Sequence, residues 1–304
     1  MKFSIYQESR KGGRKANQDR IGYSYTRDSL LMMLADGMGG HLHGEVASQI
    51  AVQFLTEAFQ REARPRLADP LQFLSKSIVN AHHALVDYAK VRQLTDTPRT
   101  TCVACVVQEG IAYWAHVGDS RLYHLREGKI QAQTRDHSRV QMLVDSGRIR
   151  EEAVAAHPDR NKIFNCLGAH TPPQVELSHK TVLRRGDTLL LCSDGLWGPL
   201  SGKIIAAALL SGDVLHAVPE LLTQAEQRAG KDADNLSVVA MNWTDSVQVQ
   251  SPGEVSTQTL ELDAVITQVE DFKKEDHSDL TDEEIERAIG EIRDAIRKHS
   301  PQKP

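Results

Sequence analysis

The segment that most constrains this chain is 30–45, LLMMLADGMGGHLHGE, in which an apolar run ends abruptly on Asp36 and Gly37. A short continuous apolar run is typical of a strand that is buried on both faces. Such a strand delivers a carboxylate to its end, and the glycines after it allow main-chain carbonyls to approach a ligand closely. Because Mg²⁺ and Mn²⁺ prefer carboxylate and carbonyl oxygens, the segment indicates a site for a hard divalent cation.

The alternative is that Asp36-Gly37 is an ordinary hairpin turn, for which Asp-Gly is among the commonest dipeptides. A hairpin requires a second strand directly after the turn. Residues 44–59, GEVASQIAVQFLTEAF, instead place apolar side chains on one helical face. We therefore predict a helix here, and on this segment alone both the metal site and the simple turn stay open.

Composition sets outer limits on the protein's class. The chain has 304 residues, of which 40% are hydrophobic and 25% charged, which is typical of a globular protein long enough for one large domain, or for a domain with an appendage. Its net charge of −5 argues against broad electrostatic binding to nucleic acid or to an anionic membrane. The sequence has no run of 18 apolar residues, and residues 1–15 lack the apolar core of a signal peptide, so we expect no membrane span and a cytoplasmic location.

The four cysteines include one C-x-x-C pair, Cys102 and Cys105, in a β-branched run. An odd spacing places these two side chains on opposite faces of a strand. Cys166 and Cys192 stand alone. Reduced structural thiols are therefore preferred over a zinc or redox site.

Periodicity predicts an alternation of short strands and amphipathic helices. Strands are expected over 2–7, 20–25, 30–36, 187–192 and 236–243. Four more short runs, separated by turn residues, predict an antiparallel meander over 100–107, 111–117, 121–126 and 129–134. Beyond the helix that follows Gly37, further helices are expected over 69–90, with Asp69 as N-cap and Pro70 at the first position, and over 203–210 and 215–229.

Four aspartates stand at the tips of these apolar runs: Asp36, Asp119, Asp194 and Asp234. If a folded sheet brings the tips to one edge, the clustered carboxylates repel one another and raise one another's pKa unless a cation lies among them. Two divalent metals about 3.5–4 Å apart relieve that repulsion and acidify a bridging water. Taken singly, Asp36 and Asp119 are equally well explained as turn residues.

The polar loop 9–20 contains Arg14 and Asp19. Arginine offers a fixed fork of donors that suits phosphoryl oxygens, and Asp19 is suited to hold a metal-bound water. The alternative is a solvated basic loop without function.

Eight motifs resemble, in order, those of the metal-dependent, type 2C (PPM) serine/threonine protein phosphatases, bacterial branch. They are RKANQD (14–19), ADGMGGHLHGEVAS (35–48), RTTCVACVV (99–107), AHVGDSRLYHLREGKI (115–130), TRDHS (134–138), HPDRNKIFNCLG (157–168), LLLCSDGLW (189–197) and DNLSVV (234–239). The resemblance implies a phosphatase domain over 1–244 with an α+β fold, a four-layer α-β-β-α sandwich of two antiparallel sheets flanked by helices.

The resemblance also implies a set of catalytic and metal-binding residues. Asp36 bridges two core Mn²⁺ or Mg²⁺ ions, the Gly37 carbonyl binds one of them, and Asp194 and Asp234 complete the pair. We expect these three aspartates and Arg14 to carry catalysis.

Three further roles follow from the same resemblance. Asp19 acts through metal-bound water, Asp119 with Asp194 holds a possible third, weaker metal, and Arg14 binds the substrate phosphate. The segment 146–167 corresponds to the flap that lies beside the channel and influences substrate choice.

The chain departs from the family pattern at two positions. Gln18 replaces a Glu found in many members, which removes one negative charge near the site and is expected to weaken metal affinity. Met38 stands where the animal enzymes have a histidine proposed as the general acid. His41 is nearby, but spacing alone does not make it the proton donor, so the general acid stays unassigned.

The predicted reaction is in-line attack of a metal-activated water on phosphoserine or phosphothreonine, without a phosphoenzyme. The expected partners are phosphorylated proteins, the targets of a serine/threonine kinase. Two alternatives stay open, a small-molecule phosphohydrolase on the same metal centre and a catalytically weak module that binds phosphoproteins. Retention of every core aspartate argues against the silent module.

Beyond residue 244 the chain changes character. Residues 245–259 form a polar stretch with Pro252-Gly253 and are predicted to be a linker. A helical tail is predicted over 260–304, where apolar residues repeat at spacings of three and four, namely Leu262, Val265, Val269 and Phe272, and then Ile285, Ile289, Ile292 and Ile296. Thr281 and Glu284 form a capping box before the second stripe. The tail either packs on its own domain or frays, or it docks on a partner or a second copy.

Overall fold

Strand β3 (Ser29–Asp36) runs through the middle of the molecule and is covered on both faces. The computed structural model of the protein describes residues 1–38, 43–150, 153–154, 157–244, 265–269 and 290. Leu31, Met33 and Ala35 of β3 pack on one side, and the alternate residues Leu30, Met32 and Leu34 pack on the other. This explains why the predicted strand is a continuous apolar run rather than an alternating one.

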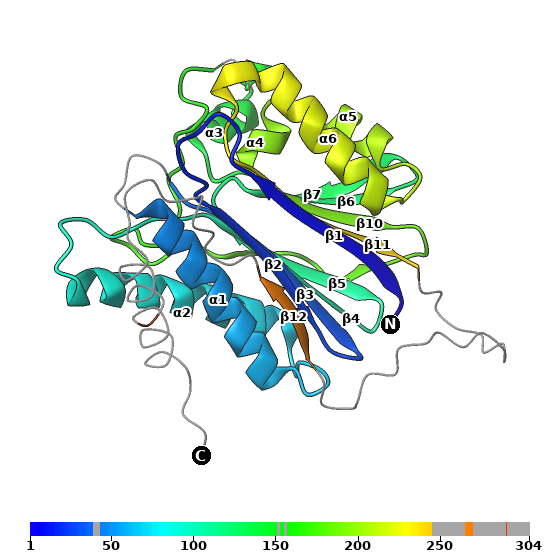
Figure 1. Cartoon of the computed structure of the whole chain (residues 1–304), viewed down its shortest axis with the longest axis horizontal. Coiled ribbons are helices and arrows are strands. Elements are labelled where there is room, and N and C mark those ends of the chain that lie inside the picture. The colour runs from blue at the N-terminus through cyan, green and yellow to red at the C-terminus, as the bar shows by residue number, and fades with distance from the viewer. Residues whose placement is uncertain (39–42, 151–152, 155–156, 245–264, 270–289, 291–304) are drawn as a thin grey trace.

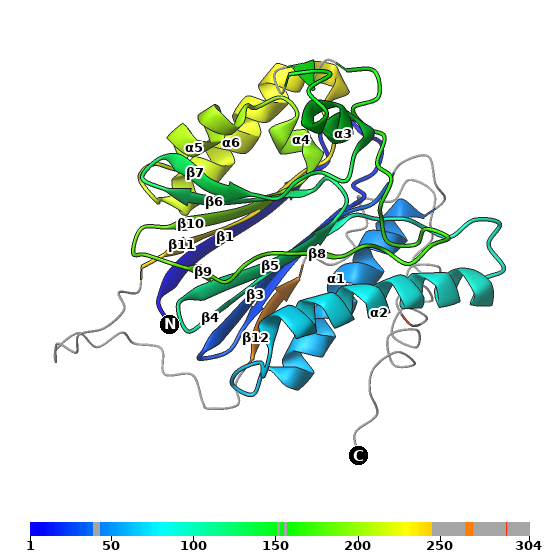
Figure 2. The same ribbon diagram turned by 180° about the vertical axis from the view of Figure 1, so that it is seen from behind.

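Two antiparallel sheets pack face to face, with helices on both outer surfaces (Figures 1 and 2). The first sheet has the order β1 (Phe3–Arg10), β11 (Leu236–Trp243), β10 (Thr188–Cys192), β6 (Arg121–Arg126) and β7 (Lys129–Gln133). The second has the order β12 (Ile266–Val269), β2 (Asp19–Tyr25), β3, β4 (Cys102–Gln108), β5 (Ile111–Val117) and β8 (Glu176–Leu177), and β9 (Thr181–Val182) also pairs with β5.

The helices divide between the two outer faces. The second sheet is covered by α1 (Gly44–Glu62) and α2 (Pro70–Val91), and the first by α4 (Asp194–Trp197), α5 (Gly202–Ala208) and α6 (Val214–Ala229). The short α3 (Arg139–Asp145) lies in the connection after β7, and a 3-10 turn, Gly230–Asp232, follows α6. Three buried clusters of apolar residues fill the spaces between the four layers. The predicted four-layer α-β-β-α sandwich is confirmed.

Local signals predicted several details correctly. The Asp69 side chain accepts a hydrogen bond from the Gln72 N–H at 3.0 Å and caps α2, with Pro70 at its first position. Cys102 belongs to the cluster under the helices, whereas Cys105 belongs to the cluster between the sheets. The odd spacing therefore does place these two thiols on opposite faces, and all four cysteines are buried and free.

The predicted meander over 100–134 is wrong at its centre. β4 pairs with β5, and β6 pairs with β7, but β6 joins β10 in the first sheet instead of pairing with β5. The segment Gly118-Asp119-Ser120 therefore crosses from one sheet to the other. Gly118 makes this possible, because its φ is +107° and a Cβ at this position would lie 2.7 Å from the Thr101 side chain, which excludes other residues.

The helical tail predicted over 260–304 is also wrong where its first apolar stripe can be checked. Ile266–Val269 is a strand, β12, that pairs antiparallel with β2. β-branched residues fit a strand as well as a helix, and the free edge of β2 offered backbone hydrogen bonds that the local pattern does not reveal. The predicted linker 245–259 and the isoleucine stripe lie outside the described residues.

No helix in the described parts of the chain combines the length and the apolar character needed to cross a bilayer.

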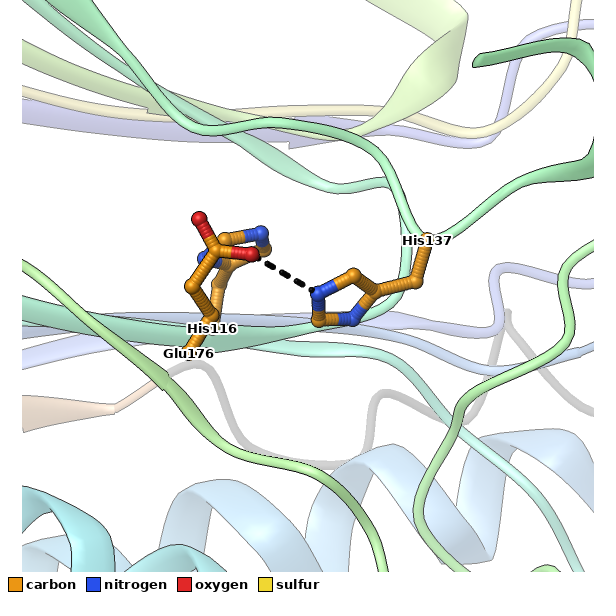
Figure 3. Close-up of side chains that lie close together, drawn as sticks. All are labelled: His116, His137 and Glu176. Atoms are coloured by element: carbon orange, nitrogen blue, oxygen red, sulfur yellow. Dashed lines mark hydrogen bonds and ion pairs between the residues drawn. The ribbon is translucent and has the colours of Figure 1, made fainter. Parts of the chain in front are cut away.

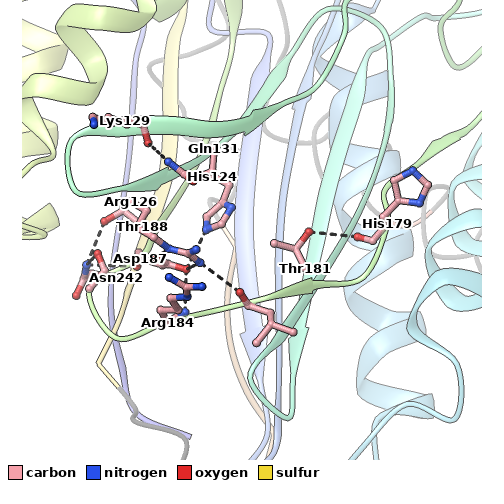
Figure 4. Close-up of polar contacts among 12 residues, drawn as sticks. His124, Arg126, Lys129, Gln131, His179, Thr181, Arg184, Asp187, Thr188 and Asn242 are labelled. Carbon is pink, nitrogen blue, oxygen red and sulfur yellow. Dashed lines mark hydrogen bonds and ion pairs between the residues drawn. The ribbon is translucent and has the colours of Figure 1, made fainter.

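A buried ion-pair network stabilises the end of the sandwich where β10 begins (Figure 4). The Asp187 carboxylate has no exposed surface and accepts hydrogen bonds from the Arg126 guanidinium at 2.7 Å, from His124 Nε2 at 2.9 Å and from the Arg184 N–H at 2.8 Å. Burial alone opposes ionisation of Asp187, but these three donors together hold its pKa well below the usual range.

We expect Asp187→Asn to lower the free energy of unfolding at pH 7 by about 2–4 kcal/mol, because it leaves Arg126 and His124 facing a neutral amide. Since the folded-state pKa of Asp187 is depressed, its contribution is complete above about pH 5 and is lost as the pH falls toward 2. Urea titrations between pH 3 and 8 measure this difference between wild type and variant. Asp213→Asn, at an exposed N-cap, is the matched control and should leave the free energy of unfolding nearly unchanged, because Asn caps a helix about as well as Asp. Equal losses in the two variants would contradict the prediction.

Candidate active site

The four aspartates predicted at strand tips converge in one cavity of 660 Å³, which also contacts Arg14, Gln18, Gly37 and Met38. Asp36 ends β3 and Asp194 follows β10, whereas Asp19 begins β2 and Asp234 precedes β11. In each antiparallel pair one strand ends where its neighbour begins, so all four ends lie on the same side of the sandwich. This topology explains why Asp234 precedes its strand in the DNLSVV motif, whereas Asp36 and Asp194 come at the ends of theirs.

Asp19 lies directly opposite Asp36 on adjacent strands. Like charges in this position destabilise a sheet. Burial, and then the charges of Asp19, Asp194 and Asp119, hold the pKa of Asp36 well above its ordinary value. Burial likewise raises the pKa of Asp19 to about 6, and that of Asp119 to about 7, where the charge of Asp136 adds to the effect. Such an arrangement is costly without a cation.

The residues of this cluster fit divalent cations. One carboxylate oxygen of Asp19, Oδ2, accepts a hydrogen bond from Ser193 Oγ at 2.8 Å, whereas Oδ1 is buried without a partner. Buried polar atoms in proteins are nearly always satisfied, so Oδ1 is suited to an ordered water or an ion. A side chain at Gly37 would meet the Gly44 and Gln18 carbonyl oxygens at 2.3 and 2.7 Å, so only glycine fits where these three segments meet.

Arg14 lies at the rim of the cavity and is half-exposed. Its guanidinium donates two hydrogen bonds to the Asp234 carboxylate, at 2.7 and 2.6 Å. The bond to Asp234 and the nearby charges of Asp194 and Asp36 raise the pKa of Arg14. The Arg14 guanidinium therefore presents a fork of donors above the carboxylates. It can bind two oxygens of one oxyanion over the cluster.

A second set of contacts fixes the backbone at Asp119. The Trp197 indole Nε1–H donates to the Asp119 carbonyl at 3.0 Å. The Arg121 guanidinium stacks 3.7 Å from the centre of the Trp197 ring and makes a bidentate ion pair with Asp136, with both bonds at 2.8 Å. Sequence reasoning assigned no role to Arg121, Asp136 or Trp197, although all three lie in the quoted motifs.

A cluster of His116, His137 and Glu176 adjoins the same turn (Figure 3), and its possible ligand atoms lie within 4.8 Å of one another. The Gly118 N–H and the Asn165 amide both donate to His137 Nδ1, at 3.1 and 2.8 Å. These partners assign the ring proton to Nε2, which faces Glu176 at 3.3 Å. A metal would have to displace this proton, so the cluster is better explained as a hydrogen-bonded support for Gly118.

A neighbouring residue explains why position 18 has a glutamine in place of the glutamate expected from the family pattern. Gln18 Nε2 donates to the Glu45 carboxylate at 3.2 Å, and a glutamate at position 18 would face Glu45 with like charge. Met38 contacts the cavity and offers no proton donor there. His41 lies outside the described residues.

The segment predicted to be a flap does lie beside the cavity, where Asn161 and Ile163 contribute to its wall. Arg160 and Asn161 also line an adjoining cavity of 300 Å³. The two cavities share Arg14, Asp194 and Asp234, so the groove continues away from the carboxylates along Trp197 and Pro199.

Comparison with known proteins agrees with this site. The family model described as "Protein phosphatase 2C" matches residues 7–215. The serine/threonine protein phosphatase PstP of Mycobacterium tuberculosis is 34% identical over 232 residues, which are 76% of this chain but only 43% of PstP, so the chain matches less than half of that protein. The serine/threonine phosphatase Stp of Listeria innocua is 32% identical, over 75% of this chain and 92% of Stp.

Solved structures extend the likeness to three dimensions. The catalytic domain of PstP in complex with two manganese ions is 32% identical and superposes with a TM-score of 0.68, over 80% of this chain and 99% of that one. A bacterial serine phosphatase, 31% identical, superposes with a TM-score of 0.74 over 81% of this chain and all of the other. Sequence, fold and the converging carboxylates agree, and the chain belongs to the protein phosphatase 2C family.

Proposed function

We propose that this protein is a metal-dependent phosphatase that hydrolyses phosphoserine and phosphothreonine in proteins that are targets of a serine/threonine kinase. The observation that carries the proposal is the convergence of Asp36, Asp119, Asp194 and Asp234 beneath Arg14 in one cavity. We assign the catalytic domain to residues 1–244, because β11, which ends at Trp243, is the last strand of the first sheet in chain order, and β12 adds only an edge strand to the second sheet.

The metal ligands in this proposal are the residues whose carboxylates repel one another. Asp36, the Gly37 carbonyl, Asp194 and Asp234 hold two Mn²⁺ or Mg²⁺ ions, and Asp19 acts through a water at its unpartnered Oδ1. Asp119 and Asp194 hold a third ion. When bound, such cations polarise phosphoryl oxygens and acidify a water molecule that attacks phosphorus in line with the leaving oxygen.

The chain's own residues position the substrate. Arg14 binds two phosphoryl oxygens through the fork that here holds Asp234, so substrate and Asp234 compete for the same donors. The groove along Trp197 and Pro199 has room for the residues that flank a phosphorylated side chain. This continuation of the groove favours a protein substrate over a small phosphorylated metabolite.

We expect Asp36→Asn and Asp194→Asn to lower kcat/KM for p-nitrophenyl phosphate by about 10³-fold or more, and EDTA to abolish turnover that Mn²⁺ restores. Asp213→Asn is the matched control and should retain full activity. Turnover that survives in EDTA or in both site variants would refute the proposal.

Stability gives an independent measure of the same cluster. The folded-state pKa of Asp194 is raised, so its ionisation costs stability as the pH rises through that pKa. In metal-free protein, Asp194→Asn should therefore raise Tm at pH 8, by an amount that shrinks toward pH 4. Differential scanning calorimetry measures this, and a lower Tm for the variant at pH 8 would contradict the repulsion.

Arg14→Ala should raise KM for a phosphothreonine peptide by about tenfold or more, and Arg14→Lys by less, because lysine supplies charge without the bidentate fork. Binding of Mn²⁺ by calorimetry should weaken by no more than about twofold in Arg14→Lys. Steady-state kinetics at saturating Mn²⁺ separates KM from kcat. An unchanged KM in Arg14→Ala would remove the residue from substrate binding.

The substrate class is tested by comparing a phosphothreonine peptide with a nucleoside monophosphate of equal charge. We expect kcat/KM for the peptide to be higher by about 10²-fold, because only the peptide occupies the adjoining groove. Arg160→Ala should lower the value for the peptide and leave that for the nucleotide unchanged. Preference for the nucleotide would favour a small-molecule phosphohydrolase.

A further inference from the structure

The chain supplies its own edge strand to the second sheet. Ile266–Val269 runs antiparallel to β2, with Ile266 opposite Tyr25 and Val269 opposite Gly22 (Figure 1, beside α1 and β2). This edge of β2 would otherwise present unpaired backbone groups, which readily pair with another strand.

Side chains on both faces of this strand contact the domain, because Gln268 Oε1 accepts a hydrogen bond from the Tyr23 hydroxyl of β2. Thr267 Oγ1 lies 2.8 Å from Ser24 Oγ and accepts a hydrogen bond from Gln60 Nε2 of α1 at 2.7 Å. Val269 packs against the apolar cluster under the helices. Ile266, on the opposite face of the strand, is 37% exposed. The contacts therefore select a hydroxyl residue, then a hydrogen-bond acceptor, and then a branched aliphatic residue.

There is space for that aliphatic residue because β2 has a glycine opposite it. A Cβ at Gly22 would lie 3.2 Å from both the Gln268 carbonyl oxygen and Val269 Cγ2. We call the edge of β2 from Gly22 to Tyr25, together with Gln60, the β2 groove.

The connection between β11 and β12 is far longer than the separation of its two ends requires. Trp243 pairs with Phe3, the Phe3 ring lies 5.6 Å from the Tyr25 ring, and Tyr25 pairs with Ile266. Both ends of the connection thus lie at the same end of the sandwich. The 22 residues 244–265 reach about 70 Å when extended. The strand is therefore held by its own contacts and by tethering, which keeps its local concentration near the millimolar range.

We propose that the β2 groove is a strand-binding site that holds Ile266–Val269 of the same chain as its resident ligand, exchangeable for an extended partner segment with the same hydroxyl–acceptor–branched-aliphatic pattern. A strand of four residues contributes few backbone hydrogen bonds to offset the entropy of ordering it. Binding is therefore readily reversible. The groove begins three residues along β2 from Asp19, so opening it leaves the carboxylate cluster in place.

The test uses full-length Val269→Asp, which buries a charge in the groove and releases the strand, and Ile266→Asp as the matched control on the exposed face. Hydrogen–deuterium exchange of residues 22–25 should be at least tenfold faster in Val269→Asp and unchanged in Ile266→Asp. A fluorescein-labelled peptide of residues 263–272, DAVITQVEDF, should bind Val269→Asp with micromolar affinity and bind wild type at least tenfold more weakly. Unchanged circular dichroism shows that each variant is folded.

Gly22→Val probes the site from the β2 side. It should accelerate exchange of residues 23–25 as Val269→Asp does, yet fail to bind the peptide, because its side chain occupies the place of Val269. Equal peptide binding by wild type and Val269→Asp, or no binding by Val269→Asp, would overturn the proposal. Dimerisation of wild type in light scattering that Val269→Asp abolishes would show that the strand comes from a second copy, which overturns the assignment within one chain.

Discussion

Electrostatic repulsion among five buried or half-buried aspartates is the constraint around which this molecule is built. Asp19 and Asp36 face each other across β2 and β3, and Asp194, Asp234 and Asp119 complete the set. Nothing local favours such a cluster. The three apolar clusters of the four-layer sandwich supply the free energy that holds the strand ends together. Burial and the charges of the neighbouring aspartates raise the pKa values of Asp36 and Asp194. Divalent cations among these carboxylates would relieve the repulsion.

The carboxylates are supported by residues that never face the cavity as ligands. Trp197 holds the Asp119 carbonyl, Arg121 stacks on Trp197, and His137 accepts from the Gly118 N–H. These contacts connect segments that lie far apart in the sequence. Such supporting contacts orient metal ligands and commonly matter almost as much as the ligands themselves. The segment that crosses from β5 to β6 therefore both connects the two sheets and positions Asp119.

Sequence reasoning succeeded where the signal was local. It failed where a strand pairs with a segment that is distant in the sequence. The aspartates could be found because each follows or precedes an apolar run, and Asp69-Pro70 marked the start of α2 through its own cap. The segment Gly118-Asp119-Ser120 looked like a hairpin turn, yet it joins two sheets. Ile266–Val269 carried a helical spacing and became a strand. In both cases a distant strand edge provided the partner, and no window of residues around the segment contains that information.

By itself, the sequence determined which residues stand at the strand ends, in what order the motifs follow, and that the carboxylates outnumber the cations among them. It also determined both faces of β3, since a continuous apolar run must be covered on each side. Only the tertiary structure decided that Arg14 pairs with Asp234, that Gln18 faces Glu45, and that the C-terminal segment closes the edge of β2. These contacts join residues that lie from 27 to 247 positions apart in the sequence, and they exist because antiparallel pairing brings remote parts of the chain to one side of a sandwich.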